Sequence, residues 1–338
     1  MIKQEITAAV DIGGTNTVVG FLDNDGNYLF GNSFPTKAEE DARQFIVRLT
    51  EQIKKLFKEY ESEFLLSGIG IAAPSANHFL GTIESPSNLK WGDVNFVDIM
   101  KEYINLPIAL TNDANAAAMG EYEFGFAKGM KNFIVVTLGT GLGSGIVVDG
   151  HLLYGENGLA GELGHTMVAA NGRQCNCGRF GCLETYASAN GIKRTIFDLL
   201  SLYNEPSELR NISFNDLSSK MINDFALQGD SIAIKAFDFT GEVLGKALAN
   251  LVACFTSEVI ILFGGLADSE ELLLAPTRKY FEKYLLKNHI GKVQILKSKL
   301  DNGMAALLGA SCLIKKEISG QASIKINAEI NNQKTLEF

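Results

Sequence analysis

The chain carries two similar glycine-rich segments, one in each half of its sequence. Residues 8–26 read AAVDIGGTNTVVGFLDNDG, and residues 134–150 read IVVTLGTGLGSGIVVDG. In each segment two apolar runs flank a glycine-rich turn and an Asp-Gly pair follows, a pattern typical of β-hairpins. A P-loop would instead join a strand to a helix and carry Gly-Lys-Ser/Thr. The repeat therefore predicts two related lobes whose glycine-rich hairpin tips face a common cleft.

The rest of the chain alternates between helix-like and strand-like stretches, which indicates an α/β architecture. The predicted helices, read from apolar side chains at helical spacing, span residues 38–60, 112–122, 229–253, 270–287 and 303–314. The predicted strands span residues 66–72, 106–110 and 259–263. In the polar tail beyond Lys316, the alternation over residues 324–330 predicts an edge strand.

Length and charge limit the classes of protein that fit. A chain of 338 residues fits two lobes of roughly 100 to 200 residues each. Its net charge of −9 argues against nucleic acid as a partner, because phosphate backbones attract basic surfaces. We see neither a basic-then-apolar leader nor a stretch near the roughly 20 apolar residues of a membrane span. We therefore expect a cytoplasmic protein with no membrane partner.

The two glycine-rich tips are candidate phosphate-binding loops. Glycine lets backbone N–H groups approach phosphate oxygens without a Cβ in the way. In the first tip Asp11 can hold Mg²⁺ through water and Thr15 can donate to a phosphate; a tight turn with a locally bonded Asp11 is the alternative. The second tip, Thr137–Gly145, has four alternating glycines, more than a hairpin turn needs. Together the tips predict a two-sided clamp on a polyphosphate.

Asn112 and Asp113 stand where a predicted strand ends and an alanine-rich helix begins. Both residue types are favoured helix N-caps, so capping alone explains them. However, ligand sites of α/β proteins lie at the carboxyl ends of strands. Phosphoryl transfer to an alcohol also requires a carboxylate that accepts the hydroxyl proton. A cap and a general base are therefore the two interpretations of Asp113.

Four potential metal ligands lie close together in the sequence: His165, Cys175, Cys177 and Cys182. One His and three Cys make a complete tetrahedral Zn²⁺ set without an open position, which indicates a structural metal. If His165 binds zinc through one nitrogen, its other N–H is free to donate to a ligand. Glu162 and Glu184 flank the cluster. The two remaining cysteines, Cys254 and Cys312, lie in apolar sequence and are interpreted as core residues.

Asn88 is a further candidate, because its amide offers both a donor and an acceptor. It follows a proline-containing turn and precedes Trp91, the one tryptophan of the chain. An ordinary loop residue beside a core tryptophan is the equal alternative.

In combination these motifs resemble the ROK family of sugar kinases and sugar-responsive repressors. The similarity covers about residues 6–314, with the motifs in the family's order and spacing. The matching motifs are Asp11-Ile-Gly-Gly-Thr15, Pro86-Ser-Asn-Leu-Lys-Trp91, Asn112-Asp113-Ala-Asn115, Leu138-Gly-Thr-Gly-Leu-Gly143, Gly161-Glu-Leu-Gly-His165, the run Cys175–Cys182 and Leu183-Glu184.

The resemblance implies a two-lobed, actin-like α/β fold with a ligand cleft between the lobes. Residues 1–114 and 303–320 would form a small N-terminal lobe, residues 115–302 a large C-terminal lobe, and residues 321–338 a polar tail. Family members of this kind are commonly dimers or tetramers, so we expect a homodimer or homotetramer.

The resemblance also implies ATP-dependent phosphorylation of a hexose, with Asp113 as the general base and with Mg²⁺ and a structural Zn²⁺ as cofactors. The sugar would be held by Asn88, Asn112, Asp113, Glu162, His165 and Glu184. The nucleotide and its phosphates would be held by Asp11, Gly13, Gly14, Thr15, Gly139, Thr140, Gly141, Gly143, Gly264 and Gly265. The zinc ligands would be His165, Cys175, Cys177 and Cys182.

Glucose is the leading substrate because Glu162, His165 and Glu184 are all present. N-acetylmannosamine, N-acetylglucosamine, mannose, fructose and allose are the alternatives, as are phosphoryl donors other than ATP. The chain has Pro74-Ser75-Ala76 where the family usually has Pro-Gly beside the sugar pocket, and its tail after Lys316 is longer than the family's.

Two other classes of protein share some of these motifs with a kinase. A sugar-sensing regulator of the family carries a DNA-binding module ahead of the first glycine loop, and we find no such element before Asp11. An actin-like or chaperone-like ATPase would share the phosphate clamp, but it would not need the cysteine cluster.

Overall fold

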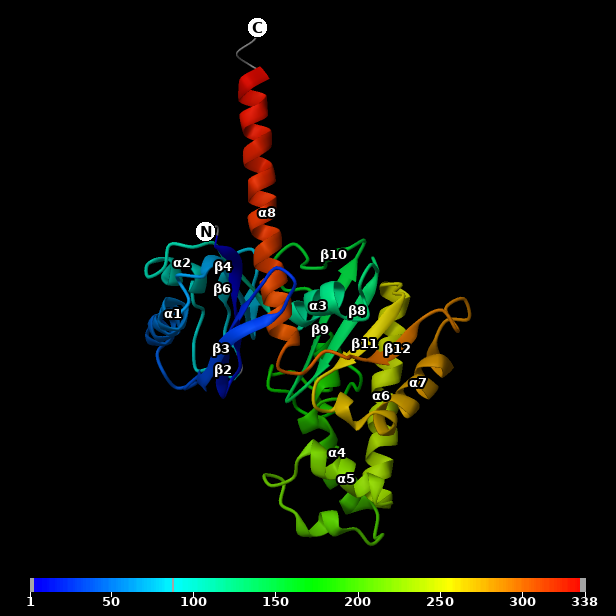
Figure 1. The fold of residues 1–338 in the computed structure, drawn as a ribbon. Coiled ribbons are helices and arrows are strands. Elements are labelled where there is room, and N and C mark those ends of the chain that lie inside the picture. The colour runs from blue at the N-terminus through cyan, green and yellow to red at the C-terminus, as the bar shows by residue number, and fades with distance from the viewer. Residues whose placement is uncertain (1–2, 87, 335–338) are drawn as a thin grey trace. The chain divides into compact units, whose positions relative to one another are not determined.

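The computed structural model describes residues 3–86 and 88–334, and the side chains up to residue 320 (Figure 1). The chain divides into two compact units. Unit 1 comprises Met1–Phe124, Glu156–Gly158 and Gly303–Phe338, and unit 2 comprises Gly125–Gly155 and Leu159–Asn302. The first boundary falls after Phe124, whereas the sequence placed it after residue 114. The difference arises because helix α3 (Asp113–Phe124) packs against helix α8 (Ala305–Lys334) of unit 1.

Unit 1 is built on a five-stranded sheet of order β3-β2-β1-β4-β7. Its strands are β1 (Gln4–Ile12), β2 (Asn16–Leu22), β3 (Tyr28–Pro35), β4 (Phe64–Ala73) and β7 (Ile108–Asn112). Strands β1 to β3 pair antiparallel, which confirms the first predicted hairpin, and β4 and β7 run parallel to β1. A small hairpin, β5 (Ala76–Asn77) with β6 (Thr82–Ile83), follows β4.

The helices of unit 1 cover this sheet. They are α1 (Ala42–Lys58), α2 (Phe96–Lys101), α3 and α8. The Asp41 carboxylate caps α1 by accepting from Arg43 N–H. Phe45, Leu49 and Ile53 of α1 are fully buried in a core with residues of β1, β2 and β4. The predicted helix over residues 38–60 is thereby confirmed.

Unit 2 repeats the plan with a sheet of order β10-β9-β8-β11-β12. Its strands are β8 (Phe133–Leu138), β9 (Leu142–Val148), β10 (His151–Leu152), β11 (Val259–Phe263) and β12 (Gln294–Lys297). Strands β8 and β9 form the second predicted hairpin, and β11 pairs parallel with both β8 and β12.

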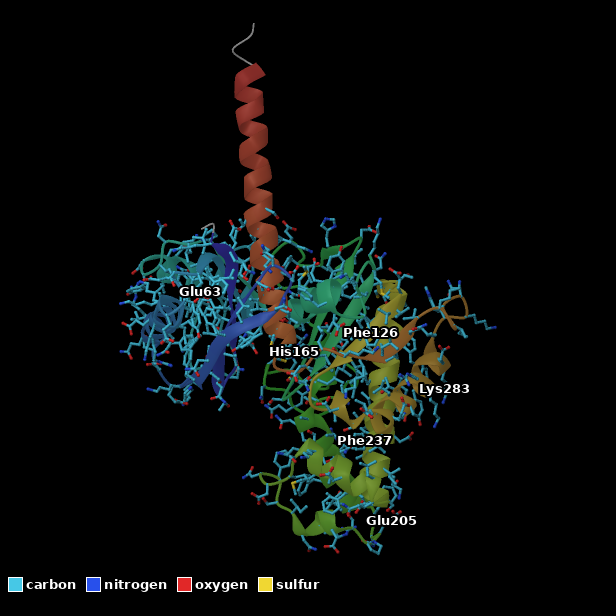
Figure 2. The ribbon with its side chains drawn as sticks, in the orientation of Figure 1. Glu63, Phe126, His165, Glu205, Phe237 and Lys283 are labelled. Atoms are coloured by element: carbon cyan, nitrogen blue, oxygen red, sulfur yellow. The ribbon has the colours of Figure 1, made fainter. Side chains whose placement is uncertain are left out.

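The helices of unit 2 are α4 (Ala189–Leu202), α5 (Ser219–Leu227), α6 (Ser231–Cys254) and α7 (Glu271–Tyr284), with short 3₁₀ turns η1 (Leu163–His165), η2 (Leu183–Thr185), η3 (Glu208–Asn211) and η4 (Ala267–Ser269). Phe237 of α6, labelled in Figure 2, is buried in this unit's own core with Ile134 and Ile260 of the sheet. None of the helices within the described residues is long and apolar enough to cross a membrane.

Two predictions about single segments were wrong. The expected edge strand over residues 324–330 belongs to α8, which continues to Lys334. No proline interrupts the sequence between Ala305 and Lys334, so nothing in the backbone forces the helix to stop. Cys254 is exposed because it is the last residue of α6, whereas Cys312 is buried as predicted.

Ser75 occupies a left-handed backbone conformation, with a φ angle of +52°. This is the position where the family usually has glycine, and the turn keeps the shape that glycine favours. Its carbonyl oxygen accepts from Glu84 N–H at 3.0 Å, which holds the turn in place. A side chain in this conformation costs roughly 1–2 kcal/mol.

We predict that Ser75→Gly raises the free energy of unfolding by about 1 kcal/mol, because it removes this steric cost but gives the unfolded chain more freedom. Urea denaturation of both proteins measures the change. Ser75→Ala is the matched control, since it keeps the Cβ and should bring no gain. Equal or lower stability of Ser75→Gly would show that the turn carries no strain.

Candidate active site

The first glycine loop, residues 13–15, joins β1 to β2 in unit 1 and has little room for side chains. Gly13 N–H donates to Asn16 O at 3.0 Å, and a Cβ on Gly13 would lie 2.8 Å from that oxygen. Thr36 braces the loop from outside, because its hydroxyl donates to Gly13 O at 2.7 Å. A Cβ on Gly14 would lie 3.2 Å from Nδ2 of Asn88. The structure thus brings Asn88, a residue distant in sequence, against this loop.

Strand register brings Asp11 to the same edge of the sheet as Asp113. Asp11 pairs with Ala72, which pairs with Thr111, and the next two residues are Asn112 and Asp113. Asn112 ends β7 and Asp113 begins α3. The carboxyl ends of these parallel strands are where α/β ligand sites lie.

Both Asn112 and Asp113 cap helix α3. Oδ1 of each accepts from Ala114 N–H at 2.8 Å. The Asp113 side chain is nevertheless exposed, so capping leaves its carboxylate accessible. The surrounding protein is dense enough that desolvation raises the pKa of Asp113, against the opposing hydrogen bond from Ala114. A recessed carboxylate that is open to water on one side accounts for both observations.

Asp11 is half-buried beside this carboxylate. Burial, and next the charge of Asp113, raise the pKa of Asp11 to about 6. Two carboxyl groups with raised pKa values at one sheet edge are typical of a functional site.

The second glycine loop, residues 139–141, joins β8 to β9 in unit 2. Gly139 and Thr140 are exposed, and a Cβ on Gly139 would meet nothing within 4 Å. The loop is held at its base, where Gly139 O accepts from Ala189 N–H at 2.9 Å and Leu142 N–H donates to Oε2 of Glu184 at 3.0 Å. Its tip therefore presents open backbone on a fixed base.

The predicted metal ligands come together in unit 2. The candidate ligand atoms of His165, Cys175, Cys177 and Cys182 all lie within 4.8 Å of one another. The Cys177 and Cys182 sulfurs are 3.6 Å apart, and the Cys175 sulfur lies 3.7 Å from Nδ1 of His165. Sulfurs at about 2.3 Å from a tetrahedral metal lie about 3.8 Å apart, so the spacing fits such an ion.

The surroundings of the cluster bear on how it could bind a cation. Burial raises the pKa of the Cys175 thiol to about 12, so a metal ion bound there would have to offset that burial for Cys175 to act as a thiolate ligand. The other ring nitrogen of His165, Nε2, faces Glu162, with 3.9 Å between it and Oε2. Glu162, His165 and Glu184 therefore all lie at this cluster, with His165 labelled in Figure 2.

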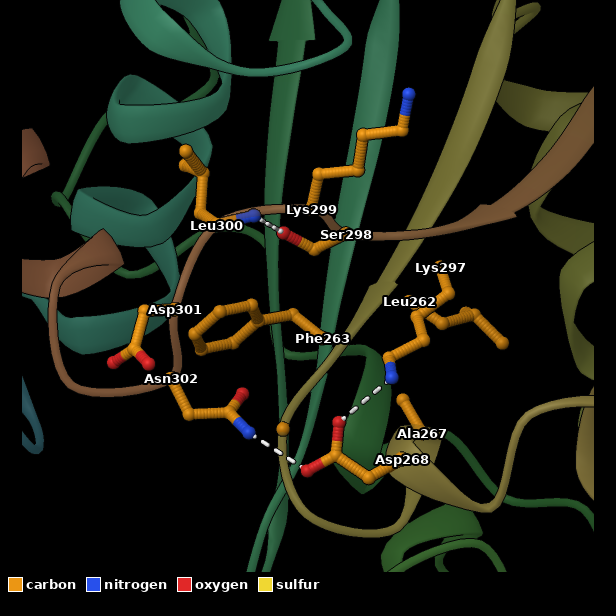
Figure 3. A pocket seen from close by; sticks show the side chains of 11 residues that line it. Leu262, Phe263, Ala267, Asp268, Lys297, Ser298, Lys299, Leu300, Asp301 and Asn302 are labelled. Carbon is orange, nitrogen blue, oxygen red and sulfur yellow. Dashed lines mark hydrogen bonds and ion pairs between the residues drawn. The ribbon is translucent and has the colours of Figure 1, made fainter.

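A cavity of about 330 Å³ lies in unit 2 at the ends of β11 and β12 (Figure 3). Gly264, with a φ angle of +99°, forms part of its wall. Lys297 and Asn302 converge on Asp268, with Nζ at 3.1 Å from Oδ1 and Nδ2 donating to Oδ2 at 2.8 Å. These three residues are outside the set predicted from sequence. The sequence signal that could have pointed to them is the polar residues at and after the ends of β11 and β12.

Comparison with known proteins agrees with these motifs. The model of the ROK family matches residues 7–317. The glucokinase of Halalkalibacterium halodurans is 34 % identical over 312 residues, which cover 91 % of this chain and 94 % of that protein. The xylose repressor of Bacillus subtilis is 30 % identical over 254 residues, covering 75 % of this chain and 62 % of the repressor.

Solved structures give the same result. A ROK family glucokinase from Streptomyces griseus, in complex with glucose and AMPPNP, has a TM-score of 0.77 and 31 % identity over 92 % of this chain and 99 % of that chain. The predicted actin-like α/β fold of sugar kinases is confirmed. The chain belongs to the ROK family.

Proposed function

We propose that this chain is an ATP-dependent kinase that phosphorylates glucose to glucose 6-phosphate. The observation that carries the proposal is the exposed Asp113 carboxylate at the carboxyl edge of the unit 1 sheet, beside a glycine loop. Its support is the similarity to proteins described as glucokinases over more than nine-tenths of the chain.

Asp113 is the general base in this mechanism. It accepts the proton of the sugar hydroxyl as that oxygen attacks the γ-phosphoryl group, and ADP leaves. One carboxylate oxygen is held by Ala114 N–H, which leaves the other for the sugar. Asn112 shares the same N–H and orients the neighbouring backbone. Its raised pKa makes Asp113 a stronger base than an ordinary aspartate.

The phosphates lie against the two glycine loops. Backbone N–H groups of residues 14–15 and 139–141 offset the charge that develops during transfer. Asp11 is the residue that would hold Mg²⁺. The adenosine occupies the cavity beside Gly264 and Gly265.

The sugar hydroxyls are held by Asn88, Asn112, Asp113, Glu162, His165 and Glu184. His165, Cys175, Cys177 and Cys182 are the residues that would hold Zn²⁺. Four protein ligands would leave no open position, so the ion would supply structural cross-linking, and the His165 ring would be fixed. Nε2 of His165 then donates to the sugar. We place this enzyme in the cytoplasm as a homodimer or homotetramer, as its family resemblance implies.

We predict that ADP release with Mg-ATP depends on sugar and is fastest with glucose. The measurement is a coupled assay of ADP over glucose, mannose, fructose, allose, N-acetylglucosamine and N-acetylmannosamine. With GTP or polyphosphate as the donor, the sugar phosphate is measured instead. The expected result is the highest kcat/KM for glucose with ATP. If another sugar gave the highest value, the substrate would be wrong; ADP release indifferent to every sugar would favour an ATPase.

We predict that Asp113→Asn lowers kcat by about 10²-fold or more and leaves the KM for glucose within a few-fold, because general-base catalysis is typically worth 10²–10⁴. The base acts in its ionised form, so wild-type kcat/KM should fall as the pH is lowered. Because the pKa of Asp113 is raised, this fall should begin at a higher pH than for an ordinary aspartate. The matched control is Asp98→Asn, which removes an exposed carboxylate on α2. Near-normal turnover of Asp113→Asn would reject this base.

A further inference from the structure

The Glu184 carboxylate lies between the second glycine loop and the metal-ligand cluster inside unit 2, beyond any role in holding the sugar. Oε2 accepts from Leu142 N–H at 3.0 Å, and Oε1 lies 3.7 Å from the sulfur of Cys175. Leu142 is the first residue of β9, directly after the second glycine loop. One side chain therefore connects the metal-ligand cluster to the base of the phosphate loop.

Gly141 makes this connection sterically possible. A Cβ at Gly141 would lie 2.2 Å from Oε2 of Glu184, a distance that no side chain tolerates. Glycine at this position thus leaves room for the Glu184 carboxylate, which belongs to the same unit. At Gly139, two residues earlier, a Cβ would meet nothing within 4 Å, so that part of the loop is open.

The opposite side of Leu142 is held by the turn that carries His165. A Cβ on Gly164 would lie 2.1 Å from Leu142 O, so η1 packs directly on that peptide. One residue pair further along β9, the Ser144 hydroxyl donates to Gly161 O. Leu142 is buried, and its backbone lies between η1 and the Glu184 side chain of η2.

Two of the candidate metal ligands belong to these turns or directly adjoin them. His165 ends η1, and Cys182 immediately precedes η2. Leu183 N–H donates to Thr166 O at 2.9 Å, which joins the turns on the side of the cluster. An ion bound by His165 and Cys182 would hold η1 and η2 at a fixed separation around Leu142.

A loop rich in glycine loses much backbone freedom when it is ordered, and that loss weakens binding of its ligand unless the loop is held beforehand. We propose that Glu184 is a positioning residue for the nucleotide phosphates: it preorganises the second glycine loop, and the metal cluster acts on ATP affinity through it. This inference rests on the proposed kinase function. It gives the cysteine cluster a role in binding the nucleotide as well as the sugar.

The test is calorimetric titration of protein purified with its metal, using Mg-AMPPNP and no sugar. Glu184→Ala and Glu184→Asp should raise the Kd about ten-fold, because each removes a hydrogen bond to a charged group, the aspartate by being one methylene too short. Glu184→Gln should stay within about three-fold, since its amide oxygen still accepts from Leu142 N–H and its amide N–H₂ reaches Cys175.

Glu162→Gln is the matched control, because Glu162 lies at His165 but is not the acceptor for Leu142 N–H. It should leave the AMPPNP Kd unchanged while raising the KM for glucose. Chelation of the metal should raise the Kd of wild type as much as Glu184→Ala does, and it should add little to that variant, because both act on the same loop. Amide hydrogen exchange of the peptide over residues 138–145 should become faster in the chelated wild type and in Glu184→Ala.

The Asp variant keeps the charge and serves if the Ala variant fails to fold. Equal AMPPNP affinity of wild type, Glu184→Ala and Glu184→Asp, with only the glucose KM altered, would overturn the inference and leave the kinase proposal standing. A wild type that binds no AMPPNP at all would overturn both.

Discussion

Parallel strand register is the constraint that positions the proposed functional residues within each unit. In unit 1 the pairing of Asp11 with Ala72, and of Ala72 with Thr111, delivers the first glycine loop and Asp113 to one sheet edge. In unit 2 the pairing of Thr137 with Phe263 delivers the second glycine loop and Gly264 to one edge in the same way. A one-residue slip in either sheet would turn these side chains to the opposite face.

Asp113 shows how one position serves both stability and chemistry. As a cap it satisfies Ala114 N–H, one of the donors that the first turn of α3 leaves unpaired. Because Asn112 accepts from the same N–H, the helix start does not depend on Asp113 alone. The carboxylate is thereby oriented by the helix while it stays accessible to solvent, which is the state a general base requires.

Much of this could be read from the sequence, and the limits have physical causes. The hairpins and the His165 cluster follow from local patterns, so sequence alone located them. The contact of Glu184 with Leu142 joins residues 42 positions apart, and the bond from Asn302 to Asp268 spans 34. No local pattern encodes such contacts. The edge strand predicted over residues 324–330 was wrong for a related reason, since apolar alternation over a few residues is also compatible with a helix.

The destination of the γ-phosphoryl group distinguishes a sugar kinase from an ATPase most directly. The measurement follows ATP labelled in that group, with Mg²⁺ and excess glucose, and separates glucose 6-phosphate from inorganic phosphate. For a sugar kinase we expect the label in glucose 6-phosphate and only slow transfer to water. Label released as inorganic phosphate at the same rate with and without glucose would contradict a sugar kinase.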